Sequence, residues 1–294
     1  MPRLAFAVLT VVVLSLAIPV LAQAPPEIAP ADAAAAPESL TSTANGTIYF
    51  GSMGKGTVYR AAAGATKADP WIDGAANQLT FVLGVLADEK AGTLWVCSNR
   101  TEPRDGVPAT GQVALHACDL KTGTPKGTYP FPNGGLCNDI AVAADGSAYL
   151  SDTTLNRILR LKPGAAALDV WAADPLLAGI DGLSFLADGV LYANSYTTNK
   201  FVRVPVKADG TAGPVAEVQS SVPFVHPDGL RTVGPNTLLQ AEGQGKLTEI
   251  TIDGGQARVR VLKEGLKDAT AVTLVGADAV VLFETRAAVP VKYH

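Results

Sequence analysis

A hairpin-like unit recurs six times along this chain of 294 residues, and this repeat limits the possible folds more than any other feature. The unit is clearest between Leu136 and Asp152, where two short apolar runs flank an Asp-Gly turn. Position +2 of the unit is always aliphatic, position +8 is Gly, Asn or Asp, and position +11 is large and apolar. If Asn138 is position 0, the frame fits at six starts, which are Glu38, Gly84, Asn138, Asp181, Asp228 and Thr270.

The six starts are 42 to 54 residues apart, which is the length of one four-stranded propeller blade. The predicted fold class is therefore all-β: a six-bladed β-propeller with four-stranded antiparallel blades around a central channel. A β-sandwich whose hairpins look alike by chance is the alternative. The sixth unit has sequence for three strands only, so we expect the ring to close with a strand borrowed from the N-terminal side.

The sequence predicts three regions. Residues 1–22 have the pattern of a secretory signal peptide, in which Arg3 precedes an uncharged apolar run with small residues at Val20 and Ala22. A retained membrane anchor is the alternative, because the run is just long enough to span a bilayer. Residues 23–36 form a Pro- and Ala-rich flexible leader, part of which could add an edge strand to the last blade, and residues 37–294 form the propeller. We therefore expect an exported protein, periplasmic or extracellular, that is not associated with a membrane after signal cleavage.

The charge of the chain limits the kinds of partner that we expect. The net charge of −4 without a Lys/Arg cluster argues against nucleic-acid binding, and we expect a monomer whose partner is a small-molecule substrate.

Cys97 ends the second strand of the second unit and Cys137 precedes the first strand of the third, so both belong at one rim of neighbouring blades. We predict a Cys97–Cys137 disulfide and a free, buried Cys118.

Position 0 starts the first strand of each unit, and the first strands of a propeller line its channel. The carboxylates of Glu38, Asp181 and Asp228 and the amide oxygen of Asn138 should therefore converge, an arrangement that is costly without a cation. One divalent metal ion is predicted, and an oxygen-only ligand set suits Ca²⁺ best, with Mg²⁺, Mn²⁺ or Zn²⁺ as substitutes. Gly84 and Thr270 are expected to leave room for water or substrate. The alternative is that these acids merely cap strand ends and bind solvent.

Two further polar features belong to the same predicted rim. The insertion from Asn99 to Gly111 either overhangs the channel or is an ordinary solvated loop. Position +14 closes the second strand of each unit, and its side chains either support and line the pocket or are simple polar strand ends. These residues are Ser52, Ser98, Asp152, Ser195, Glu242 and Glu284.

At these residues the chain resembles the senescence marker protein/gluconolactonase (regucalcin-like) family of six-bladed propellers, with paraoxonases as more distant relatives. The motifs that carry the resemblance are Pro37-Glu38, Asn138-Asp139-Ile140-Ala141 with Asp145-Gly146, Asp181-Gly182-Leu183 and Pro227-Asp228-Gly229-Leu230. The resemblance implies that Glu38, Asp181 and Asp228 hold one divalent metal and that Asn138 faces metal-bound water or substrate. Members of the family hydrolyse sugar lactones.

The chain departs from this family at two positions. Asp181 stands where the family usually has Asn, which adds a negative charge to the ring. Leu136 stands where the family often has an Arg that grips a sugar acid. The second departure argues against a gluconolactone-like substrate.

The predicted function is metal-dependent hydrolysis of a lactone or a related ester. A metal in the ring would polarise the substrate carbonyl and lower the pKa of a bound water. Asp228 or Asp181 would be the general base, Asn138 would stabilise the oxyanion, and His226 is either a proton shuttle of the paraoxonase kind or a structural residue. The sequence has no Gly-x-Ser-x-Gly motif, which argues against a covalent serine mechanism. The alternatives are a non-catalytic metal-containing ligand-binding propeller and a strictosidine-synthase-like enzyme, which would need a channel Glu such as Glu242 or Glu284.

Overall fold

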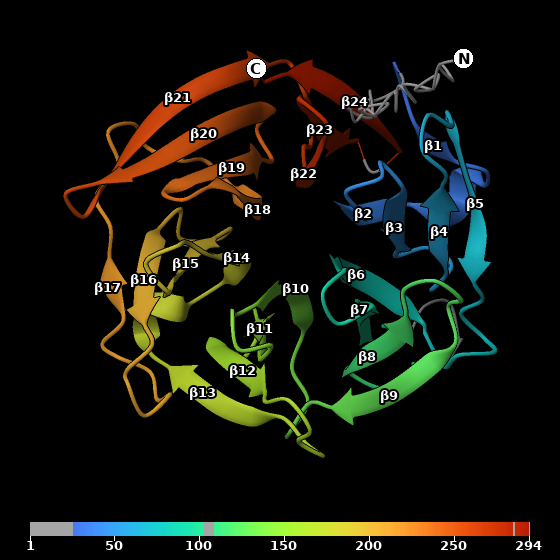
Figure 1. Ribbon diagram of the computed structural model, residues 1–294, viewed down its shortest axis with the longest axis horizontal. Coiled ribbons are helices and arrows are strands. Elements are labelled where there is room, and N and C mark those ends of the chain that lie inside the picture. Colours follow the sequence, from blue (N-terminus) through green and yellow to red (C-terminus); the bar gives the residue numbers. More distant parts are fainter. Residues whose placement is uncertain (1–25, 103–108, 285, 294) are drawn as a thin grey trace, which may run out of the picture.

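Six antiparallel sheets surround a central axis in the computed structural model, which describes residues 26–102, 109–284 and 286–293 (Figure 1). Successive sheets along the chain are neighbours around the axis, and the strands of each sheet follow one another from the axis outward. The predicted six-bladed β-propeller is therefore confirmed.

The first blade consists of β2 (Pro37–Ser42), β3 (Ile48–Ser52), β4 (Val58–Ala61) and β5 (Lys67–Ile72), with β1 (Ala29–Pro30) added at its outer edge. The second consists of β6 (Phe81–Asp88), β7 (Thr93–Asn99), β8 (Ala114–Asp119) and β9 (Pro125–Pro130). The third consists of β10 (Cys137–Val142), β11 (Ala148–Asp152), β12 (Arg157–Leu161) and β13 (Asp169–Ala173).

The fourth blade consists of β14 (Ile180–Phe185), β15 (Val190–Ser195), β16 (Phe201–Pro205) and β17 (Ala216–Glu217). The fifth consists of β18 (Pro227–Gly234), β19 (Thr237–Glu242), β20 (Lys246–Asp253) and β21 (Gln256–Glu264). The sixth has three strands, β22 (Ala271–Val275), β23 (Asp278–Phe283) and β24 (Ala287–Lys292). Two short 3₁₀ helices, η1 (Ala33–Ala35) and η2 (Pro175–Leu177), lie in the segments that lead into the first and fourth blades.

Apolar side chains pack between neighbouring blades and form the core. Tyr149, at position +11 of the third blade, is 2% exposed and packs edge-on against Trp171 of its own blade, with ring centroids 4.8 Å apart. It also packs against Phe185 of the fourth blade, with centroids 5.0 Å apart. In this blade the large residue at position +11 is therefore buried at an interface between blades, where aromatic rings contribute strongly to stability.

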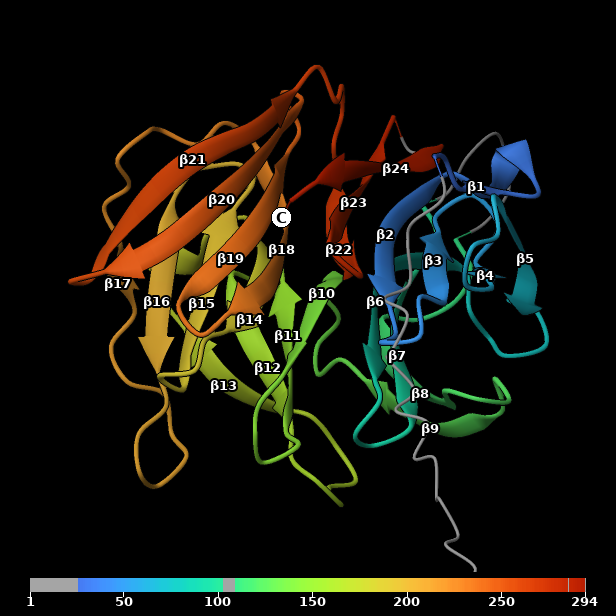
Figure 2. The ribbon, with the colours of Figure 1, turned by 45° about the horizontal axis from the view of Figure 1, so that its top comes forward.

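The N-terminal side closes the ring, as the missing strand of the sixth unit predicted. Ile28 pairs with Ala288 of β24 through two backbone hydrogen bonds of 2.9 and 2.8 Å, and it is 1% exposed. The next two residues form β1, which pairs in parallel with β5 of the first blade. Figure 2 shows β1 between β24 and β5. The segment predicted as a leader thus joins the last blade to the first.

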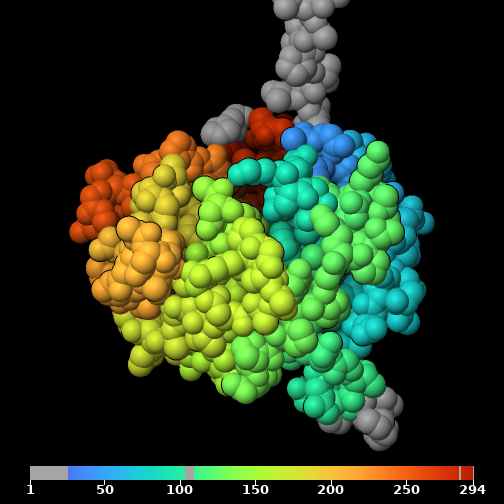
Figure 3. Space-filling model, turned by 60° about the horizontal axis from the view of Figure 1, so that its bottom comes forward, coloured from blue at the N-terminus to red at the C-terminus, as the bar shows by residue number. Residues whose placement is uncertain are grey.

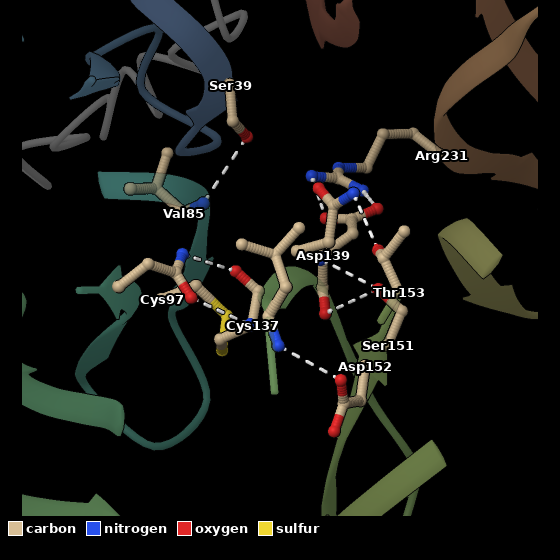
Figure 4. The surroundings of a disulfide bond; sticks show 12 residues. Ser39, Val85, Cys97, Cys137, Asp139, Ser151, Asp152, Thr153 and Arg231 are labelled. Carbon is tan, nitrogen blue, oxygen red and sulfur yellow. Dashed lines mark hydrogen bonds and ion pairs between the residues drawn. A yellow bond between two sulfur atoms is a disulfide. The ribbon is translucent and has the colours of Figure 1, made fainter. Parts of the chain in front are cut away.

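The predicted disulfide is present between Cys97 of β7 and Cys137 of β10, with α-carbons 5.2 Å apart (Figure 4). It covalently links the second and third blades. Cys118 is free and buried in β8, as predicted, and burial raises the pKa of its thiol to about 11.

The predicted signal peptide, residues 1–22, lies outside the described residues, as do residues 103–108 of the predicted insertion. The described ends of that insertion come together, since the Thr101 N–H donates to the Thr110 carbonyl at 3.0 Å. Within the described part of the chain, no helix is long and apolar enough to cross a membrane.

Candidate functional site

Five of the six predicted ring residues line one small cavity on the axis. These are Glu38, Asn138, Asp181, Asp228 and Thr270; the first four stand at the start of the first strand of their blade, and Thr270 directly precedes β22. The space that a water-sized particle can occupy there is about 10 Å³, enough for roughly one water molecule or ion. The space-filling view shows one face of the ring, on which a hollow lies between the second and third blades (Figure 3).

The repeat frame is wrong by one residue in the second blade. In the third blade, position −1 (Cys137) pairs with position +14 (Asp152). Position +2 (Ile140) pairs with position +12 (Leu150). In the second blade the residue that pairs at the +2 level is Val85, so Leu83 and not Gly84 stands at position 0. The hairpin between β6 and β7 contains one extra residue, which shifted the frame. The second blade therefore contributes no polar side chain at this position.

Gly84 occupies position +1 instead, like Gly182 and Gly229, and all three glycines have the same role. A β-carbon on Gly84 would lie 2.2 Å from the carbonyl oxygen of Asn138 in the next blade. The corresponding distances are 2.4 Å from Gly182 to the Asp228 carbonyl and 2.6 Å from Gly229 to the Thr270 carbonyl. Any side chain here would collide with the backbone that carries the next ring residue. Gly is thus required by close approach of the first strands.

Asp139 and Arg231 form an ion pair across the channel that sequence reasoning did not find. The Arg231 guanidinium donates from Nη1 and Nη2 to the two carboxylate oxygens of Asp139, at 2.7 and 2.9 Å (Figure 4). Asp139 is 5% exposed, and both residues line the ring cavity. Such a bidentate pair joins the third and fifth blades and places a fixed positive charge beside the acids.

The acids of the ring perturb one another. Burial, and then the charge of Asp139, raises the pKa of Asp181 to about 7, although a hydrogen bond from Asn138 opposes the shift. Burial raises the pKa of Asp228 well above its ordinary range, and Asp181 and Glu38 add to the shift. The pKa of Glu38 is also well above its usual range, because of burial and of Asp181. The three carboxyl groups therefore cannot all be ionised at low cost without a cation.

Asn138 is held by a residue that sequence reasoning missed. Its side-chain amide donates to the Thr153 hydroxyl at 3.0 Å, and that hydroxyl donates to the carbonyl of Ile180 at 2.6 Å. Ile180 directly precedes Asp181. Thr153 therefore fixes the orientation of the Asn138 amide and ties it to the strand that carries Asp181.

Five of the six position +14 residues are buried and hold neighbouring backbone, which is a supporting role, whereas the sixth, Glu284, is half-buried. None of them lines the ring cavity. Ser52 and Ser195 donate to the carbonyls of Ala35 and Ala178, at 2.5 and 2.6 Å. The Ser98, Asp152 and Glu242 side chains accept from the N–H groups of Thr80, Leu136 and Val225. Each bond holds the segment that leads into the first strand of the same blade and so positions the ring residue that follows.

Three residues with a predicted catalytic role lie away from the cavity lining. His226 is exposed at the rim and stacks on Tyr196, with ring centroids 4.9 Å apart. The Glu242 carboxylate is 2% exposed and also accepts from the Thr248 hydroxyl at 3.1 Å, so it is not a channel acid. Glu284 pairs with Arg286. The specific acid that a strictosidine-synthase-like reaction would need is therefore not supplied by either Glu.

The chemistry of the lining fits a hard divalent cation. Four blades contribute carboxylate or amide oxygens, and the buried Thr270 hydroxyl has no hydrogen-bond partner among the described residues. Among the residues that the structure describes, no three His, Cys, Asp or Glu side chains are already arranged as a metal-ligand cluster. The carboxylates of the ring would therefore have to turn toward the cation. Glu38, Asn138, Asp181 and Asp228 are the residues that can hold it.

No protein-family model matches the chain, and no curated protein is similar to it. Solved structures are similar in fold. A gluconolactonase from Xanthomonas campestris superposes with a TM-score of 0.66 at 18% identity, over 92% of this chain and 87% of the other. A structural-genomics protein proposed to be a gluconolactonase gives 0.66 at 19% identity, over 85% of each chain. Virginiamycin B lyase from Staphylococcus aureus gives 0.62 at 14% identity, over 90% of this chain and 98% of the other. At these identities the likeness shows the fold alone, and a propeller fold serves several reactions.

Proposed function

We propose that the protein is an exported, metal-dependent hydrolase that acts on a lactone or a related ester. One observation carries the proposal: the oxygen-bearing side chains of Glu38, Asn138, Asp181 and Asp228, from four different blades, line one cavity on the axis. The fold likeness to gluconolactonases supports the same reaction class. Export rests on the signal-like pattern of residues 1–22.

A single divalent cation, best suited as Ca²⁺, would be held by these four residues, with Mg²⁺, Mn²⁺ or Zn²⁺ as possible substitutes. When bound, it would supply polarisation of the carbonyl and a lowered pKa for water. Asp228 is the general base of the proposal, because its carboxylate lines the same cavity as the water that the cation would hold. Asp181 is the second candidate for this role.

The remaining residues orient the reactants. Water would add to the carbonyl carbon as its proton passes to Asp228, and the ester C–O bond would break as the alkoxide leaves and takes up a proton. The Asn138 amide, which donates to the Thr153 hydroxyl, would also donate to the oxyanion that develops. The Asp139–Arg231 pair holds the third and fifth blades at a fixed separation around this step.

The test is an assay of the purified protein on a panel of lactones and aryl esters, with and without chelator, beside calorimetric titration with Ca²⁺. Asp228→Asn keeps the shape and an oxygen ligand, so it should lower turnover by about 10²-fold or more with little change in thermal stability. Glu38→Gln should weaken metal binding and activity together. Asp69→Asn, at an exposed site on the first blade, is the matched control and should change neither.

If Asp228→Asn binds Ca²⁺ normally and keeps full activity, the catalytic assignment is wrong. If the wild type binds Ca²⁺ but hydrolyses no member of the panel, the result supports a non-catalytic ligand-binding propeller instead.

A further inference from the structure

Tyr196 and His226 form an exposed ring stack at the rim that carries the candidate site. Their planes are 15° apart, their centroids are 4.9 Å apart, and Tyr196 is 37% exposed. Tyr196 directly follows β15 of the fourth blade and His226 directly precedes β18 of the fifth. The stack therefore spans the boundary between the two blades that carry Asp181 and Asp228.

The stack lies beside these two acids. The Tyr196 N–H donates to the carbonyl of Gly179 at 3.1 Å, two residues before Asp181, and His226 stands two residues before Asp228. The pKa of the Tyr196 phenol is raised by burial and then by the charges of Asp228 and Asp181, so the phenol lies within their electrostatic range. A substrate whose reactive group is at the ring can thus reach the stack with an adjoining group.

The two rings are held in place before any ligand binds. His226 has the left-handed backbone angle φ 50°, and its N–H donates to the Asn199 side chain at 2.8 Å. Its carbonyl accepts from the Gly243 N–H at 2.8 Å. A β-carbon on Gly243 would lie 3.3 Å from the His226 β-carbon and 3.4 Å from the Tyr196 ring. The absence of a side chain at Gly243 therefore lets both residues pack closely against its backbone. A preformed surface binds a ligand without the cost of ordering it.

We propose that the Tyr196–His226 stack is a subsite for a flat apolar group of the substrate, which makes aryl esters and aryl-substituted lactones the preferred substrates over polyhydroxy sugar lactones. This inference rests on the hydrolase function proposed above. An aromatic face attracts another ring by offset or edge-to-face contact.

The experiment separates binding from catalysis with phenylacetone, the ketone analogue of phenyl acetate in which a CH₂ group replaces the ester oxygen and prevents hydrolysis. Its affinity is measured by ligand-observed NMR on the full-length mature protein with Ca²⁺. Tyr196→Ala should weaken binding by roughly three- to tenfold, the effect of losing one aromatic contact, whereas Tyr196→Phe should retain it. His226→Asn should also weaken binding, and it is suited to the test because Asn tolerates the left-handed backbone.

Leu155→Ala is the control, since Leu155 is a 44% exposed apolar residue on a loop at the same rim of the third blade. It should leave the phenylacetone affinity unchanged. The same variants are then assayed on phenyl acetate and on gluconolactone, and Tyr196→Ala should raise the KM for the aryl ester without raising it for the sugar lactone.

Equal phenylacetone affinity in the wild type and in Tyr196→Ala would overturn the subsite, even if the protein is an active hydrolase. Binding that depends on Tyr196 in a protein without hydrolase activity would support the subsite and overturn the proposed function. The two inferences can therefore fail separately.

Discussion

Burial of Asp181 among other acids makes the metal-free protein sensitive to pH. Its pKa is about 7 in the folded protein, against 3.8 for an ordinary aspartate, so the folded state holds the proton more tightly. The resulting stabilisation is complete below about pH 4 and is lost as the pH rises through 7. In chelator, the wild type should therefore be more stable at pH 5 than at pH 8, by an amount on the order of a few kcal/mol.

Thermal unfolding in chelator across this pH range tests the expectation. Asp181→Asn removes one of the three carboxyl groups with a raised pKa and should reduce the dependence, whereas Glu38 and Asp228 maintain the rest of it. The exposed Asp69→Asn should keep the wild-type slope. Saturating Ca²⁺ should reverse the trend, because the cation binds the ionised carboxylates. A stability that rises from pH 5 to pH 8 in the wild type without metal would contradict this account of the ring.

At the scale of the single blade, the position +14 tether determines where the first strand begins. Ser195 is 2% exposed and donates to the Ala178 carbonyl at 2.6 Å, and its oxygen also accepts from the Thr198 N–H and hydroxyl. Ser195→Ala leaves these buried groups without their partner, so it should lower the free energy of unfolding by about 1–3 kcal/mol. It should also weaken Ca²⁺ binding, because the tethered segment leads directly to Asp181.

Denaturant unfolding and metal titration measure the two effects. Ser221→Ala is the matched control, since the Ser221 hydroxyl accepts from the Val259 N–H at 2.9 Å at an exposed edge, where water can replace it. Similar losses in the two variants would mean that burial of the tether is not what makes it important.

Much of the blade could be predicted because its pattern is local. The turn residue at position +8 and the aliphatic residue at position +2 lie within one hairpin, so the frame found the strands and the oxygen-bearing residues of four blades. Cys97 and Cys137 followed from the same frame, because it places the end of one blade's second strand beside the start of the next blade. The tethers were visible as polar residues at position +14, but the backbone groups that they bind are fixed only by the folded loop.

The frame failed where the information is not local. Because of the extra residue in the β6–β7 hairpin, the frame assigned position 0 to Gly84 instead of Leu83. Leu83 could not be recognised from the sequence, because its strand contains several other aliphatic residues. Asp139 and Arg231 are 92 residues apart and belong to different blades, so no spacing rule joins them. The Tyr196–His226 stack likewise forms only when the fourth and fifth blades are adjacent.

At the scale of the whole molecule, the ring depends on a short N-terminal segment for closure. Ile28 is 1% exposed and belongs to the same apolar cluster as residues of the first and sixth blades. Ile28→Ala leaves a cavity at this junction, so it should lower stability by about 2–5 kcal/mol. The melting temperature should fall by several degrees.

Differential scanning calorimetry on the two mature proteins provides the measurement. Val170→Ala, which truncates a 47% exposed aliphatic residue on β13, is the control and should change stability by less than about 0.5 kcal/mol. An Ile28→Ala variant as stable as this control would show that the closing segment is dispensable.

Because Ile28 pairs with Ala288, the arrangement of the blades around the axis does not depend on which blade comes first in the sequence. Ile28, near the start of the described chain, lies beside Ala288 of the last strand, so a linker that runs back along β24 could join the two ends. A circular permutant that begins at an exposed turn such as the one at Gly164 would have the same neighbours throughout. The ring residues on the axis should therefore keep their positions in such a permutant, whichever blade is translated first.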